Sequence, residues 1–287
     1  MLGLSLRDIL ELSLLGTLVT VAGNLIASWL TGYVFARSFE RWKAQQALLT
    51  VYRRYRDPIV LSASELCRRL REIYCFYPPP FLKTELLKLQ PVPPLQKNAY
   101  DDPHFQYYKL ISTMYRLCAF LGWLELYRQE ITFLDSGHDQ TNLRLEKCLD
   151  SIRDDLSEGE LNQAEDRIEW QEGLLFKEEQ RAIGHAMICE TKQGRTIMDY
   201  ASFCTLIDAT SGTVKSPWVE SVQHFFCDRQ PHAKDDFRKI RFSLLIKHLV
   251  KLVELLDNKR VSEELKAIPA MREIIHEADK FELNLPH

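Results

Sequence analysis

Glycine is scarce in this chain, and the short motifs that mark common enzyme families are missing. There are 11 glycines among 287 residues. No regular alternation of apolar and polar residues between turn residues stands out, which argues against a protein built from hairpins. The sequence contains no GxxxxGK[ST], GxGxxG, HExxH or GxSxG motif, so nothing predicts a phosphate loop, a dinucleotide fold, a zinc protease or a serine hydrolase. We expect no cofactor.

Neither the net charge nor the cysteine spacing points to a particular ligand. Lys and Arg number 37 against 40 Asp and Glu, a formal net charge of −3, which gives no nucleic-acid footprint. The seven cysteines are irregularly spaced and form no CxxC pair, so we expect reduced thiols packed as small hydrophobic residues. Glu273 and His276 form one Glu-x-x-His half motif without a second copy, and no metal site is expected.

The most distinctive stretch is an uncharged run from Leu12 to Ala36. As a helix it is about 37 Å long, enough to cross a hydrocarbon core of about 30 Å. Basic residues dominate after the run and only Arg7 precedes it, which predicts an N-terminus outside and a cytoplasmic remainder. We expect a single-pass helix in the inner (plasma) membrane or another internal membrane. A cleaved signal peptide and a buried core helix are the alternatives.

Small and polar residues recur at every fourth position of this run. Such a stripe allows close approach of helix backbones and supplies interhelical hydrogen bonds, so it predicts a contact within the membrane. The partner is a second copy of the chain or another membrane protein. The alternative is that the hydroxyl groups bond back to their own helix. The stripe consists of Gly16, Thr20, Asn24, Ser28 and Gly32.

The rest of the sequence predicts an all-α protein, because Leu, Glu, Arg, Lys and Gln dominate it. We expect the transmembrane helix to continue to about Arg56, to break at Asp57-Pro58, and to lead into a multi-helix cytoplasmic bundle. Residues 1–43 are assigned to the anchor and the start of a stalk, and 44–287 to the helical domain with a proline-rich arm at 78–103. Apolar spacing predicts helices over 58–77, 81–89, 103–134, 141–156, 176–190, 196–208, 217–227 and 235–258.

Six arginines near the expected membrane surface form a candidate basic cluster. Such a cluster attracts anionic lipid headgroups. A solvated helix face is the alternative, and the sequence favours neither. The six are Arg53, Arg54, Arg56, Arg68, Arg69 and Arg71.

A second candidate site lies on one predicted helix face. Glu178, Arg181 and His185 follow the spacing i, i+3, i+7, and a buried cluster of this kind binds a polar ligand or an anion. The alternative, which we favour, is an ion pair that fixes helix packing, because a His beside an Arg does not activate a nucleophile. Gly184 within the helix indicates close approach of another helix. We assign no catalytic residue.

Three segments carry a pattern that is similar to a known family: Trp42 with Tyr55-Arg56-Asp57-Pro58, the helix 115–134, and Glu179–Gly184. The second segment includes Trp123, Glu125, Arg128 and Phe133. Over about residues 10–205 the chain resembles a family of uncharacterised bacterial proteins. The resemblance implies an N-terminal membrane helix ahead of a helical domain and no particular activity. An acidic residue often follows the glycine in that family, where this chain has His185.

These features together predict a membrane-tethered helical interaction module: a scaffold, assembly or regulatory subunit of a membrane complex. The expected partners are membrane lipid and either a second copy of the chain or another membrane protein, with no nucleic acid. Enzymatic activity is the less favoured interpretation. Two alternatives stay open: a membrane-bound enzyme or ligand-binding protein that uses the 178–185 helix face, and a self-associating membrane oligomer. The enzyme requires that face to line a cavity of a few hundred Å³.

Overall fold

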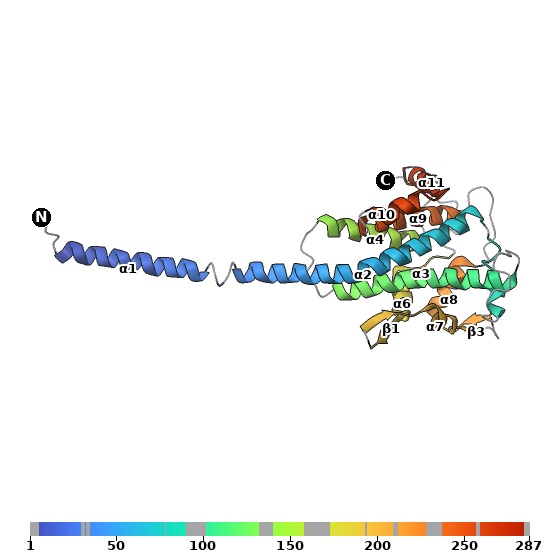
Figure 1. The fold of residues 1–287 in the computed structure, drawn as a ribbon, viewed down its shortest axis with the longest axis horizontal. Helices are drawn as coiled ribbons and strands as arrows, with labels where there is room; N and C mark the ends of the chain where they lie inside the picture. Colours follow the sequence, from blue (N-terminus) through green and yellow to red (C-terminus); the bar gives the residue numbers. More distant parts are fainter. Residues whose placement is uncertain are drawn as a thin grey trace. The chain divides into compact units, whose positions relative to one another are not determined.

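A computed structural model describes residues 6–29, 32, 35–77, 79–89, 102–131, 140–157, 173–192, 194–208, 212–227, 237–256 and 259–283. Most of them are helical (Figure 1), which confirms the all-α prediction as a fold class. The helices are α1 (Leu6–Trp29), α2 (Ala36–Cys75), the 3-10 helix η2 (Thr84–Lys88), α3 (Pro103–Ile131), α4 (Gln140–Ser157), α6 (Lys177–Ala186), α7 (Tyr200–Cys204), α8 (Pro217–Phe226), α9 (Phe237–Leu256), α10 (Arg260–Lys266) and α11 (Met271–Leu283).

The chain divides into two compact units. One comprises Met1–Thr50 with Leu134–Gly137, and the other comprises Val51–Phe133 with His138–His287. Helix α1 belongs to the first unit, and α2 begins in it and continues into the second.

Most of the predicted span over Leu12–Ala36 lies in helix α1. Helix α1 ends at Trp29 and α2 begins at Ala36, and residues 30, 31, 33 and 34 between them lie outside the described residues. Gly32 and Phe35, the described residues of this interval, are π-helical. Among the helices that the described residues form, none combines the length and the apolar character needed to cross a membrane.

Helix α2 does not break at Asp57-Pro58, so that prediction was wrong. It runs through Pro58 to Cys75, although a proline inside a helix costs about 3 kcal/mol. One face of the helix is buried both before and after the proline: Tyr55 is 1% exposed and Ile59 is 3% exposed. Packing of this face against the core offsets the local penalty, as tertiary contacts often override propensity.

Helix α3 is the central element of the second unit. Its buried residues point in several directions and include Leu110, Ile111, Leu117 and Cys118, all fully buried. It contacts α6, α7, α8 and η2 (Figure 1). On the other side of the core, α9 packs against α4, α10 and α11. Apolar residues on more than one face of α3 account for this central position.

Two small hairpins replace parts of predicted helices. Strand β1 (Ile188–Thr191) pairs antiparallel with β2 (Gly194–Ile197), and β3 (Ile207–Asp208) pairs with β4 (Thr213–Val214). The helix predicted over 176–190 was therefore wrong at its end, where residues 188–190 belong to β1. The helix predicted over 196–208 was wrong at both ends, where residues 196–197 belong to β2 and residues 207–208 to β3. Gly194 has φ +115°, a backbone conformation that glycine adopts readily and other residues rarely do, and it begins β2 directly after the turn.

Part of the proline-rich arm packs on its own domain. Residues 79–89 contain η2, and Phe81, Leu82, Leu86 and Leu87 are buried in the core. Residue 78 and residues 90–101 of the arm lie outside the described residues. The described part thus contributes apolar side chains to the second unit.

Candidate functional site

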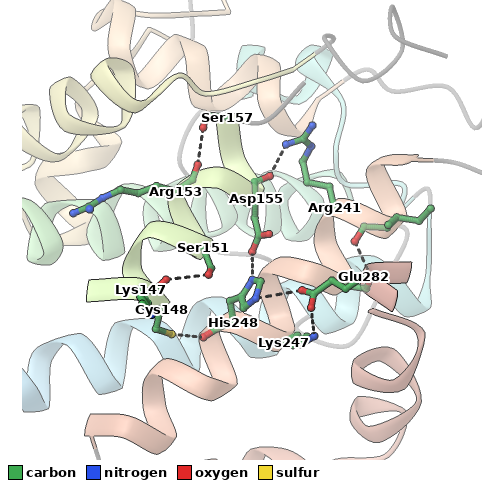
Figure 2. Close-up of polar contacts among 12 residues, drawn as sticks. Lys147, Cys148, Ser151, Arg153, Asp155, Ser157, Arg241, Lys247, His248 and Glu282 are labelled. Carbon is green, nitrogen blue, oxygen red and sulfur yellow. Dashed lines mark hydrogen bonds and ion pairs between the residues drawn. The ribbon is translucent and has the colours of Figure 1, made fainter. Parts of the chain in front are cut away.

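The most concentrated polar cluster of the second unit joins α4, α9 and α11 (Figure 2). Oδ2 of Asp155 lies 2.7 Å from Nδ1 of His248, and Nε2 of the same ring lies 3.4 Å from Oε1 of Glu282. Asp155 and His248 are both buried, at 5% and 8% exposed. One imidazole therefore connects carboxylates from two helices that are far apart in the sequence.

Two cations complete the cluster. Lys247 Nζ lies 2.6 Å from both Asp279 Oδ1 and Glu282 Oε2, so α9 is tied to α11 at two neighbouring positions. The buried guanidinium of Arg241 donates a hydrogen bond to the backbone carbonyl of Asp155 (Figure 2). A buried polar network stabilises only when its members are satisfied, and here the carboxylates face donors.

Burial dominates the electrostatics of Asp155. Desolvation raises the pKa of its carboxyl to about 6, while the contacts with His248 and Arg241 act in the opposite direction and the charge of Glu282 adds to the rise. The carboxyl group thus keeps its proton to a higher pH than an exposed aspartate does. A shift of this kind occurs in active sites and in structural ion-pair networks alike, so geometry must distinguish the two.

The geometry of the cluster favours a structural role. Both ring nitrogens of His248 face carboxylates, so neither is left to act on a substrate. The neighbouring thiol of Cys148 donates to the backbone carbonyl of His248 at 3.5 Å, and burial raises its pKa to about 11. A thiol activated for catalysis needs a lowered pKa. The cluster therefore acts as a clamp between α4, α9 and α11.

The ligand-binding candidates from the sequence lie on the surface of α6. The side chains of Glu178, Arg181 and His185 are all exposed, so the buried cluster that would bind a ligand is not formed. The close helix approach inferred at Gly184 is confirmed. A Cβ at Gly184 would lie 2.6 Å from the backbone oxygen of Leu121 on α3, closer than atoms can approach.

A polar cluster that the sequence did not single out lies on α3 beside this contact. Glu125 is buried and accepts hydrogen bonds from Arg128, at 2.7 and 2.8 Å, and from Gln129 at 2.7 Å. Burial alone would raise the pKa of Glu125, but these bonds and the charge of Arg181 outweigh it and hold the pKa below its usual value. Arg195 of β2 donates to Gln129. In the sequence, the i, i+3 spacing of Glu125 and Arg128 is the feature that indicates this ion pair.

The arginine cluster is not one continuous surface. Arg53, Arg54 and Arg68 are exposed and Arg56 and Arg71 are partly buried, but Arg69 is only 3% exposed. Its guanidinium bonds to Ser112 Oγ at 3.0 Å and lies 3.3 Å from Glu72 Oε2. Its place in a surface cluster was therefore a wrong prediction, because an arginine on the apolar side of a helix is drawn into the core when partners are present.

The small-residue stripe is exposed along α1 and at Gly32. A Cβ added at Gly16 or at Gly32 would meet nothing within 4 Å. Thr20 Oγ1 donates a hydrogen bond to the carbonyl of Gly16 at 2.7 Å. This is a bond within the same helix, as in the alternative interpretation of the stripe. Interhelical contact by the stripe stays a prediction.

The cysteines are free thiols, four of them buried: Cys67, Cys118, Cys148 and Cys227. No group of three His, Cys, Asp or Glu side chains able to hold a metal occurs within the described ranges. Glu273 and His276 both lie exposed on α11.

The fold and these clusters define a predominantly helical protein whose buried polar groups join helices together. Comparison of the chain with protein-family models, with curated proteins and with solved structures finds no match. The resemblance to a bacterial family therefore stays a prediction.

Proposed function

We propose that this protein is a membrane-tethered helical interaction module, a scaffold, assembly or regulatory subunit of a membrane complex. The observation that carries the proposal is the surface of α1. Its large apolar side chains are between 57% and 68% exposed. They are Leu10, Leu14, Leu15, Leu18, Val19, Val21, Leu25, Ile26 and Trp29.

A lipid environment accounts for this surface better than a protein groove. Soluble proteins rarely expose a contiguous apolar patch larger than a few hundred Å². At 3.6 residues per turn the large apolar side chains, such as those at positions 14, 15, 18, 19 and 21, cover about half of the circumference of α1. The other half carries the small-residue stripe, and from residue 12 to residue 29 no side of the helix has a charged residue. The uncharged sequence also continues past Trp29 to Ala36. The flanking charges favour an outside N-terminus and a cytoplasmic domain.

The second unit supports an interaction role rather than chemistry. The buried polar clusters around Asp155 and around Glu125 pair internally, and the imidazole of His248 is occupied on both sides. The candidate face on α6 is exposed rather than enclosed. A module that holds helices rigidly and presents its outer surface is suited to binding another protein.

Fractionation of cells that express the full chain tests the tether. We expect the wild type in the membrane fraction after a high-pH carbonate wash. Val19→Arg should move it to the soluble fraction, because an arginine at the centre of a span costs about 2.5–3.5 kcal/mol. Leu61→Arg is the matched control, since Leu61 is 62% exposed on α2. A wild type that is extracted by carbonate contradicts the tether.

Purification in mild detergent tests the scaffold role. A scaffold should co-purify with another membrane protein in a fixed ratio, and a reporter fused to the C-terminus should be active in the cytoplasm. A pure homo-oligomer would instead support self-association. In that case Gly16→Leu and Gly32→Leu should reduce the assembly size, because larger side chains separate the helices.

A further inference from the structure

The start of α2 presents an exposed surface that combines aromatic rings with a cation. Phe35, Phe39 and Trp42 follow the spacing i, i+4, i+7 and are 62%, 57% and 53% exposed. The rings of Phe39 and Trp42 stack with their centroids 5.8 Å apart, and Lys43 Nζ lies 5.7 Å from the centre of the Phe39 ring. We call Phe35, Phe39, Trp42 and Lys43 the aromatic-basic surface.

This surface is shallow and open, and its neighbours in the sequence are mainly basic. A shallow groove is lined by Phe35, Ala36, Ser38, Phe39 and Trp42. Between residues 36 and 50 the sequence has three basic residues, at positions 37, 41 and 43, against one acidic residue at position 40. The chain as a whole carries a net charge of −3, so the local excess of positive charge is opposite in sign to the whole molecule.

From these features we infer that the aromatic-basic surface binds anionic phospholipid headgroups at the membrane interface. The inference rests on the proposed membrane tether and adds the lipid class that it prefers. Aromatic rings such as that of Trp42 favour the boundary between acyl chains and headgroups. A lysine beside them keeps its ammonium group at the phosphate level while its stem covers apolar surface.

Charge complementarity decides between the possible occupants. A purely apolar partner gives no role to a cation held over the Phe39 ring, whereas an anionic lipid offers acyl chains to the rings and a phosphate to the ammonium group. The surface spans the end of the uncharged run at Ala36, which is where an interfacial segment must lie if that run enters lipid.

A competition between two vesicle populations tests the inference on the full chain. Vesicles of phosphatidylcholine alone and vesicles in which phosphatidylserine replaces part of it are mixed with the protein and then separated by density. The readout is the ratio of protein on anionic to protein on neutral vesicles, so any contribution of α1 that is common to both cancels. We expect the wild type to favour the anionic vesicles despite its negative net charge, and the preference to fall as salt screens the charges.

Lys43→Glu should lower this ratio about 25-fold, since it changes two units of charge at about fivefold each. The matched control is Lys192→Glu, the same charge change at an exposed position of the second unit, and it should leave the ratio unchanged. Equal binding of the wild type to both vesicles, or an equal effect of both variants, overturns the inference while the tether stands. Protein that floats with neither vesicle contradicts the tether itself.

Discussion

Oδ2 of Asp155 and Nδ1 of His248 lie 2.7 Å apart, although 93 residues separate them in the sequence. The pair joins α4 to α9, and Glu282 on the far side of the ring joins α9 to α11. Removing one member of such a buried pair leaves the other without compensation, which commonly costs several kcal/mol. The contact is therefore a point where stability responds both to mutation and to pH.

The stability of the protein should depend on pH through Asp155. Its pKa is raised from 3.8 to about 6 in the folded chain, so between these values the folded state holds a proton that the unfolded state has lost. The stability that this group contributes is complete below the unfolded pKa and is lost as pH rises through about 6. The loss amounts to about 3 kcal/mol.

Asp155→Asn isolates this effect, because the amide does not titrate. As pH rises from about 4 to about 7, the wild type loses about 3 kcal/mol of its free energy of unfolding that the variant keeps. The stability of the variant relative to the wild type should therefore increase by this amount. Urea unfolding at each pH measures it. A constant difference between the two proteins across this range would show that the carboxyl titrates normally.

Gly184→Ala should destabilise the second unit. The added Cβ would overlap the backbone oxygen of Leu121 at 2.6 Å and Glu125 Cβ at 2.8 Å, and such overpacking costs about 1–3 kcal/mol. Alanine has a better helix propensity than glycine, and this offsets about 1 kcal/mol of the cost. His185→Ala, one residue further along α6 and exposed, should change stability by less than about 0.5 kcal/mol. Equal melting temperatures for the two variants would contradict the close contact.

Arg69→Ala and Arg68→Ala should behave differently although the residues are adjacent. Arg69 is buried and bonded to Ser112 and Glu72, so its loss should lower the free energy of unfolding by about 3 kcal/mol. Arg68 is exposed, and its loss should cost less than about 0.5 kcal/mol. Chemical denaturation compares them. If Arg68→Ala were the more harmful change, the assignment of the two side chains would be reversed.

Thiol reagents should distinguish the cysteines by burial. Cys75 is exposed, whereas Cys67, Cys118 and Cys148 are buried, and burial raises the pKa of Cys67 to about 12 and that of Cys148 to about 11. Because the thiolate is the reactive form, we expect Cys75 to react fastest of these four. Cys75→Ser should remove the fastest phase of the labelling reaction. Mass spectrometry of labelled peptides identifies which cysteine reacts in that phase. Rapid labelling of Cys67 in the folded protein would contradict the packing of α2.

The helical class and most helix positions followed from the sequence because apolar periodicity and capping residues are local properties. Asp102 illustrates this: its carboxylate accepts a hydrogen bond from the backbone N–H of His104 at 3.0 Å, and an aspartate before a proline is a common start of a helix. Gly184 was also informative, since a glycine inside a helix costs stability unless another helix approaches closely.

The remaining features depend on contacts between distant segments. The path of α2 through Pro58 is decided by the burial of Tyr55 and Ile59, and the burial of Arg69 by Ser112 and Glu72. The clamp around His248 draws on three helices, and no spacing within one helix indicates it. Short hairpins such as β1–β2 are equally difficult to predict, because four-residue strands carry little periodicity.

The residues of the clamp leave the ribosome at different times during synthesis. Asp155 leaves the ribosome 93 residues before His248, which at about 5–20 residues per second is a delay of roughly 5–20 s. During that time α4 has made its carboxylate but lacks the imidazole that pairs with it. The apolar helix α1 has emerged well before. The second unit therefore stays incomplete for these seconds while α1 is already outside the ribosome.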